Sequence, residues 1–167
     1  KSGDIYSVDI HRDRYEFPDL KRKMIMLNNQ WRGKGLRGIY IEDKASGQSL
    51  IQELKRESGV SVIPYRISTD KVTRLSAVLP LLEGGRVLIP DNAPWLDAFH
   101  DECQTFPSGK HDDQIDALSI GLDVLARTPS TGEYYKPPSF STSDKDSGIF
   151  SYKSDLNSGL SWRNWGE

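Results

Sequence analysis

Three aspartates crowd the start of the stretch "HDDQIDALSIGLDVLA", which otherwise reads as an ordinary amphipathic helix. Asp112 and Asp116 lie one turn apart on the same helix face, and Asp113 projects about 100° away from them. The helix dipole favours one or two acids in a first turn, but three like charges repel one another unless something compensates them. Two of these carboxylates could therefore converge on a cation.

A second acidic pair ends the short apolar run "GIYIED" at residues 38–43, which is typical of a buried strand. Active residues of open α/β sheets gather at the carboxyl ends of strands. Side-chain alternation puts Glu42 on the same face as Tyr40, whereas Asp43 points the other way or begins the loop. Capping of the helix that follows is the plain structural alternative for these acids.

Carboxylates without His or Cys suit hard divalent cations such as Mg²⁺ or Mn²⁺. Two such ions roughly 3.5 to 4 Å apart activate water and stabilise the leaving oxygen of a phosphodiester. We expect the carboxylates of Glu42 and of Asp112 or Asp113 to approach within about 8 Å, so that they can share an ion. Spacing alone leaves a metal nuclease and a set of helix caps as open alternatives.

The elements that must position these acids alternate along the chain, which predicts an α/β fold with at least part of its sheet parallel. Apolar periodicity predicts strands at 5–10, 38–43, 60–67 and 86–90, and helices at 17–31, 45–59, 70–83, 92–106 and 112–126. Pro18 suits a first helical turn, Asn92 is a candidate cap, and Pro80 should kink its helix.

Composition limits the class of protein. With 167 residues, of which 36% are hydrophobic, the chain can bury one core. We expect one domain over residues 1–127 and a flexible tail rich in Ser, Gly and Pro over 128–167. The sequence has no run of the roughly 20 apolar residues that a membrane span needs. No signal peptide is apparent and Cys103 is the single cysteine, so we expect a soluble protein of a reducing cytoplasm.

The net charge of −2 argues against a general polyanion binder, but residues 1–37 hold nine Lys or Arg against five Asp or Glu. This local balance of +4 could contact phosphates or could be a solvated surface. Lys44 stands beside the acids, and Lys71 and Arg74 lie one turn apart; these three are candidate DNA contacts, with ordinary surface charge as the alternative.

The order "YSVDIHRDRYEFPDLKRKM", "IYIEDKASGQSLIQELKRESG" and "FPSGKHDDQIDALSIGLDVL" resembles the carboxyl-terminal nuclease domain of phage terminase large subunits over about residues 5 to 126. The resemblance implies a ribonuclease H-like fold, a mixed sheet flanked by helices. It also implies two Mg²⁺ or Mn²⁺ ions and the cutting of concatemeric viral DNA in the host cytoplasm. The implied catalytic metal ligands are Glu42, Asp112 and Asp113, with Asp116 more distant from the metal.

The resemblance also implies partners: double-stranded DNA, the terminase ATPase motor, the small terminase subunit and the portal. The chain has no GxxxxGK[ST] motif of its own. The family's first strand carries an aspartate ligand, and nothing before residues 5–10 can be that strand, so we expect an amino-terminally truncated domain that cuts weakly. Asp9 matches a later, non-catalytic position. The alternatives are a nuclease-inactive module for DNA binding or packaging assembly, and a ribonuclease H-like recombinase or resolvase.

Overall fold

The computed structural model of the chain describes residues 4–128, which form two compact units. Unit 1 combines residues 4–12 with residues 71–128, and unit 2 is the continuous segment 13–70. Unit 2 is therefore inserted in the sequence of unit 1. The tail predicted at 128–167 lies outside the described residues apart from Thr128.

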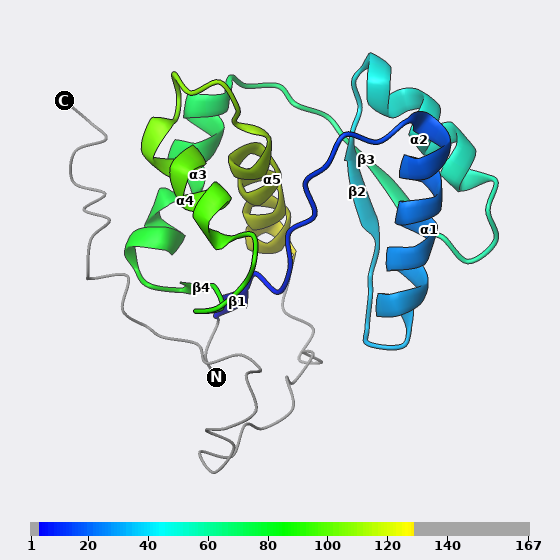
Figure 1. Cartoon of the computed structure of the whole chain (residues 1–167), viewed down its shortest axis with the longest axis horizontal. Helices are drawn as coiled ribbons and strands as arrows, with labels where there is room; N and C mark the ends of the chain where they lie inside the picture. Colours follow the sequence, from blue (N-terminus) through cyan, green and yellow to red (C-terminus); the bar gives the residue numbers. More distant parts are fainter. Residues whose placement is uncertain (1–3, 129–167) are drawn as a thin grey trace, which may run out of the picture. The chain divides into compact units, whose positions relative to one another are not determined.

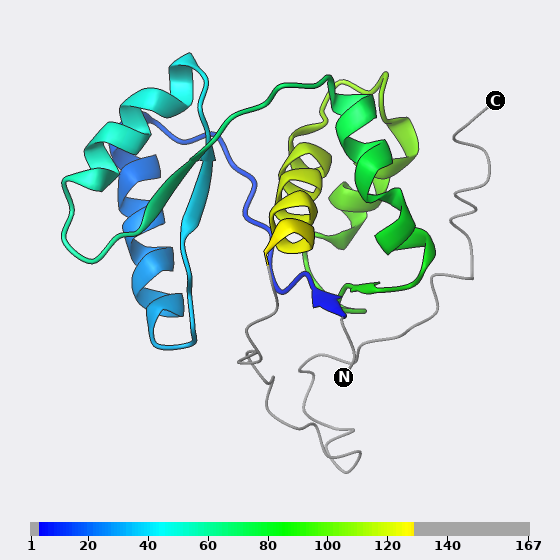
Figure 2. The ribbon, with the colours of Figure 1, turned by 180° about the vertical axis from the view of Figure 1, so that it is seen from behind.

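Unit 2 is a strand–helix–strand arrangement preceded by a long helix (Figure 1). Its elements are α1 (Phe17–Arg32), β2 (Ile39–Glu42), α2 (Ala45–Lys55) and β3 (Val62–Tyr65). Strands β2 and β3 pair in parallel, with Glu42 opposite Tyr65. A parallel pair needs a crossover, and α2 provides it. Figures 1 and 2 show both helices on the same side of the strand pair.

The core of unit 2 is built mainly from one face of α2, where Leu50, Ile51 and Leu54 are buried. Asn28 of α1 is also buried and donates a hydrogen bond from Nδ2 to the carbonyl oxygen of Gly59 at 3.2 Å. Gly59 has a φ of +81°, which a side chain would disfavour. This bond fixes the turn between α2 and β3 against α1, and so supports the strand pair.

Unit 1 consists of three helices and a short pair of strands. Its elements are β1 (Ile5–Tyr6), α3 (Lys71–Glu83), β4 (Val87–Leu88), α4 (Leu96–Thr105) and α5 (Asp113–Arg127). Strands β1 and β4 pair in parallel, with Ile5 opposite Val87. Helix α5 packs against both α3 and α4.

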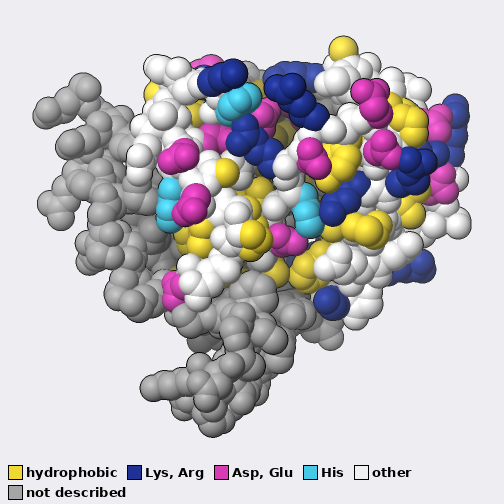
Figure 3. Space-filling model, in the orientation of Figure 1, with side chains coloured by type: hydrophobic (Ala, Val, Ile, Leu, Met, Phe, Trp, Pro, Cys, Tyr) yellow, Lys and Arg dark blue, Asp and Glu magenta, His cyan; other side chains and the backbone are white. Residues whose placement is uncertain are grey.

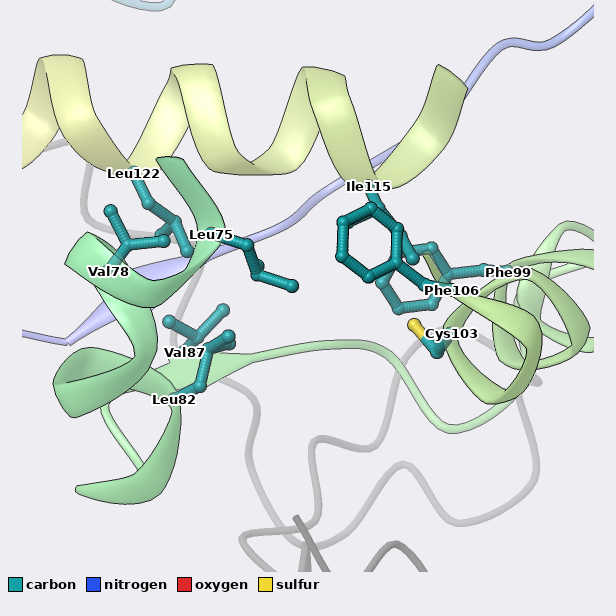
Figure 4. Packing of buried hydrophobic residues seen from close by; sticks show 9 residues of the cluster. All are labelled: Leu75, Val78, Leu82, Val87, Phe99, Cys103, Phe106, Ile115 and Leu122. Atoms are coloured by element: carbon teal, nitrogen blue, oxygen red, sulfur yellow. The ribbon is translucent and has the colours of Figure 1, made fainter. Parts of the chain in front are cut away.

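The core of unit 1 lies between these three helices and β4 (Figure 4). Its buried members are Leu75, Val78, Leu82, Val87, Phe99, Cys103, Phe106, Ile115 and Leu122. Ile115 and Leu122 come from the apolar stripe that the sequence predicted for the last helix. Burial of Ile115 and Leu122 fixes the rotation of α5 and the direction of the acids at its start, whereas Leu125, predicted for the same stripe, is 52% exposed.

Several boundaries differ from those that periodicity predicts. Strand β1 covers only Ile5–Tyr6 of the predicted 5–10, since the pairing with β4 ends there. Helix α4 begins at Leu96 with Trp95 at its N-cap, so the prediction that Asn92 caps it is wrong. Helix α3 contains Pro80 and ends at Glu83, where the sequence predicted its end. No helix within residues 4–128 is long and apolar enough to cross a membrane.

Candidate functional site

Glu42 is the last residue of β2, at the carboxyl end of the parallel pair in unit 2. Its Oε1 atom is buried and accepts no hydrogen bond from the described residues. Lys44 Nζ lies 2.5 Å from this oxygen, an ion pair that lacks hydrogen-bond geometry. The Lys44 side chain is 65% exposed and that of Glu42 is 35% exposed, so the pair lies at the surface, where an ion pair contributes little. A metal ion at Glu42 Oε1 would therefore have to displace the Lys44 ammonium group.

The start of α2 lies directly against this strand end. Gly47 approaches so closely that a Cβ atom there would collide with the carbonyl oxygen of Glu42. The same Cβ would lie 3.4 Å from Ile41 Cγ2, so Ile41 faces α2. Alternation then puts Glu42 on the other face with Tyr40, as the sequence predicted. The glycine of "IEDKASG" thus has a structural reason, which is to let the helix begin next to the acid.

Asp43 follows Glu42 and has a different role. Its backbone N–H donates to the carbonyl oxygen of Tyr65 at 2.8 Å, which continues the strand ladder by one bond. Its Oδ2 accepts a hydrogen bond from Arg66 Nε at 3.3 Å. Asp43 is therefore tied to the end of β3, and Glu42 remains the available acid of this pair.

The acidic cluster in unit 1 lies at the start of α5. Asp112 is the N-cap residue of α5, yet its side chain makes no capping hydrogen bond. Instead its Oδ2 accepts a hydrogen bond from Lys71 Nζ of α3 at 2.8 Å. The same ammonium group donates to the carbonyl oxygen of Pro107 at 2.5 Å and lies 5.4 Å from the ring centroid of Phe106. Lys71 is thus held in place by three different groups.

Asp116, one turn further along α5, pairs with Arg74 of α3. The Arg74 side chain is only 6% exposed, and its Nε also donates to Ser119 Oγ at 3.1 Å. Lys71 and Arg74 therefore face α5 and compensate two of the three like charges that the sequence placed there. The predicted shared face of Asp112 and Asp116 is the face that α3 covers.

Asp113, the first residue of α5, is exposed, and its side chain has no hydrogen bond or ion pair with any residue in the described part of the chain. It therefore keeps its full capacity for an external cation. Within either unit, the described residues contain no group of three or more His, Cys, Asp or Glu side chains arranged to hold a metal. Glu42 belongs to unit 2, and Asp112 and Asp113 belong to unit 1, so their convergence stays a prediction.

The amino end of α5 is capped by a residue that sequence reasoning missed. Glu102 of α4, 3% exposed, accepts hydrogen bonds through Oε1 from the backbone N–H groups of Gln114 at 2.6 Å and Ile115 at 3.1 Å. Its Oε2 accepts from Gln114 Nε2 at 2.9 Å and lies 3.7 Å from Arg12 Nη1. In the sequence, Glu102 looks like any charged residue of an amphipathic helix; only its place between Phe99 and Cys103 hinted at burial.

The basic residues of the amino-terminal segment are partly neutralised. Lys21 of α1 forms ion pairs with Glu53 at 3.1 Å and with Glu57 at 2.9 Å, and hydrogen bonds to these carboxylates raise the pKa of Lys21. Arg22 pairs with Asp19. Figure 3 shows basic and acidic side chains interspersed over unit 2 on the side that it draws. The segment therefore has a weaker positive field than its composition suggests.

The three DNA contacts proposed from the sequence differ in their surroundings. Lys44 is largely exposed beside Glu42. Lys71 is about one-third exposed and engaged with Asp112. Arg74 is buried, and its guanidinium is occupied by Asp116 and Ser119, so it has an internal role in this structure.

Comparison with known proteins gives a match to a protein family. A family model described as the terminase RNaseH-like domain matches residues 2–123. No curated protein and no solved structure matches the chain. The matched segment contains both acidic stretches, "IED" at 41–43 and "HDD" at 111–113.

Proposed function

Because the chain belongs to the terminase RNaseH-like domain family, we propose that it is a metal-dependent endonuclease that cuts concatemeric viral DNA during packaging. The observation that carries the proposal is the family match over residues 2–123, which spans Glu42, Asp112 and Asp113. Membership makes the chain a nuclease-type domain of the terminase and sets it in the context of a DNA-packaging complex. The metal, the substrate and the cutting step are the proposed parts.

The proposed metal ligands are Glu42, Asp112 and Asp113, with Mg²⁺ or Mn²⁺ as the ions. Their surroundings support that role: Glu42 Oε1 accepts no hydrogen bond and pairs with the exposed Lys44, Asp112 pairs with Lys71 and does not cap its helix, and the Asp113 side chain has no partner among the described residues. Carboxylate oxygens are the donors that these hard cations prefer. When bound, two ions would activate water and stabilise the leaving oxygen of the phosphodiester.

Residues of the chain would contribute by position and charge. Lys71 holds Asp112 through an ion pair, and an incoming cation would compete with its ammonium group. Lys44 is exposed beside Glu42 and can contact a phosphate. Arg74 is left out of the proposed DNA contacts because it is buried against α5. The ATPase motor, the small subunit and the portal are proposed partners on the same family basis.

The test is plasmid cleavage by the full chain with Mn²⁺ or Mg²⁺. Asp112→Asn and Glu42→Gln should abolish nicking and leave DNA affinity nearly unchanged, because these side chains hold metal and not phosphate. Asp101→Asn, an exposed acid of α4, is the matched control and should cut like the wild type. Wild-type cutting rates in Asp112→Asn would overturn the assignment.

The alternative function, a nuclease-inactive module for DNA binding or packaging assembly, is separated by a second measurement. Binding to a random duplex should weaken steeply with salt, because neutralised phosphates release counterions. Salt-dependent binding together with no cleavage at any metal concentration would favour the alternative. Equal affinity for the duplex at low and high salt would count against both the nuclease and the DNA-binding module.

A further inference from the structure

A helix start usually needs a side chain to accept hydrogen bonds from its second and third N–H groups, because the first four N–H groups have no partner within the helix. In α5 these are the N–H groups of Gln114 and Ile115, and both donate to Glu102 Oε1. Asp112, at the N-cap position and of a preferred capping type, makes no such bond. Glu102 of α4 has replaced the local cap.

The burial of Glu102 is otherwise hard to explain. A buried carboxylate is stable only when its oxygens are hydrogen-bonded or paired. Glu102 meets this condition through two backbone donors, Gln114 Nε2 and Arg12, and it also lies at the positive end of α5. Gln114 strengthens the link, because its Nε2 donates to the carbonyl oxygen of Ala98 at 3.3 Å as well. Three groups of α5 thus bind Glu102 to the start of that helix, and Arg12 of the amino-terminal segment pairs with the same carboxylate.

This arrangement has a consequence for Asp112. Because Glu102 satisfies the N–H groups of α5, the carboxylate of Asp112 is released from capping and pairs with Lys71 instead. We infer that Glu102 is a positioning residue: it caps and orients the start of α5 so that Asp112 and Asp113 are available to a divalent cation. The inference rests on the proposed function for its metal, and on the contacts within unit 1 for the cap.

Mn²⁺ binding to the full chain, measured by the paramagnetic signal of the free ion, is the main readout. Glu102→Gln keeps the shape of the side chain but turns one acceptor into a donor, which opposes Gln114 Nε2 and Arg12. We expect the dissociation constant for Mn²⁺ to rise about tenfold, the lower end of the effect typical for residues that orient metal ligands. Asp101→Asn, one position earlier and exposed, should bind Mn²⁺ like the wild type.

Hydrogen exchange of the metal-free protein reports the cap itself. The amides of Gln114 and Ile115 should exchange faster in Glu102→Gln than in the wild type, at a temperature where both are folded. A purely structural role would lower the melting temperature and leave the Mn²⁺ affinity of the folded protein unchanged. Unchanged affinity in folded Glu102→Gln, with binding lost in Asp112→Asn, overturns the inference.

Two further outcomes, loss of the metal assignment and loss of folding, can be told apart from failure of the positioning role. If Asp112→Asn binds Mn²⁺ like the wild type, the metal assignment in the proposed function falls, and amide exchange alone decides whether Glu102 is the cap. If Glu102→Gln does not fold, Gln114→Ala removes one link and keeps both backbone bonds. Gln114→Ala should raise the dissociation constant for Mn²⁺ by a smaller factor than the rise of about tenfold expected for Glu102→Gln. An unchanged dissociation constant in Gln114→Ala would overturn the positioning role of Glu102.

Discussion

The thiol of Cys103 packs in the core of unit 1, where burial raises its pKa to about 12 and the negative charge of Glu102 adds to the shift. Since the thiolate is the reactive form, the folded chain should be alkylated by iodoacetamide far more slowly than the unfolded chain at pH 8. Mass spectrometry of samples quenched over time, with and without denaturant, measures both rates. Equal rates would show that Cys103 is accessible.

The same shift predicts a dependence of stability on pH. The folded pKa of about 12 lies above the ordinary value of 9.0, so the neutral thiol favours the folded state. This contribution is complete below about pH 9 and is lost as the pH rises through the folded value, because the unfolded chain ionises first. The free energy of unfolding of the wild type should therefore fall relative to that of Cys103→Ala between these values. If the free energies of unfolding of the wild type and of Cys103→Ala changed in parallel with pH, the raised pKa of Cys103 would be contradicted.

The close approach of Gly47 to Glu42 leads to a prediction for another single residue. In Gly47→Ala, the new Cβ collides with the backbone of Glu42, which cannot move aside like a flexible side chain. We expect a loss of about 1–3 kcal/mol in the free energy of unfolding, as for other overpacked sites. Gly33→Ala is the control, because nothing lies within 4 Å of its Cβ and its φ of −74° suits alanine. Denaturant titration compares the two variants.

The ion pair of Arg74 in α3 with Asp116 in α5 should contribute more to stability than an ion pair on the surface. Arg74 is buried, so removing its charge or that of Asp116 leaves the partner poorly solvated. A double-mutant cycle with Arg74→Met and Asp116→Asn should give a coupling on the order of 1–3 kcal/mol. The exposed pair Arg22 and Asp19 of α1 should give less than about 1 kcal/mol. Similar couplings for both pairs would mean that burial of Arg74 contributes little.

At the level of elements, periodicity predicted most of what the structure contains. The five helices within residues 4–128 and the strands β2, β3 and β4 lie within or next to the predicted ranges, because their apolar residues repeat at helical or strand spacing. The α/β class of the ribonuclease H-like family is confirmed. The predicted start of α4 was wrong, because Asn92 is a residue type that is preferred as a cap but lies four residues before the helix begins.

The site was less predictable, since its contacts join residues far apart in the chain. Lys71 and Arg74 look like a basic surface in the sequence, and only the packing of α3 on α5 turns them toward Asp112 and Asp116. Glu102 reaches Gln114 across a loop whose path no local pattern specifies. The acids themselves were visible as a charge cluster, but their partners depend on tertiary structure.

For the whole molecule, the division into two units predicts separate responses to core mutations. Leu54 of α2 is fully buried in unit 2, and Leu54→Ala should destabilise that unit by about 2–5 kcal/mol. Hydrogen exchange should rise within residues 13–70 and stay unchanged in the core of unit 1, since each unit opens around its own core. Leu122→Ala, in the core of unit 1, is the reciprocal control. A uniform rise after either change would mean one cooperative unit.

The pairing of β1 with β4 has a consequence for the order of folding. Unit 2 is continuous in sequence, so its contacts form between residues that are close along the chain. Ile5 meets Val87 only when a loop of about 80 residues closes, and that closure costs more entropy than any local contact. Domains with many local contacts fold faster than those that depend on distant pairings. Unit 2 should therefore form early, and β1 should join unit 1 last.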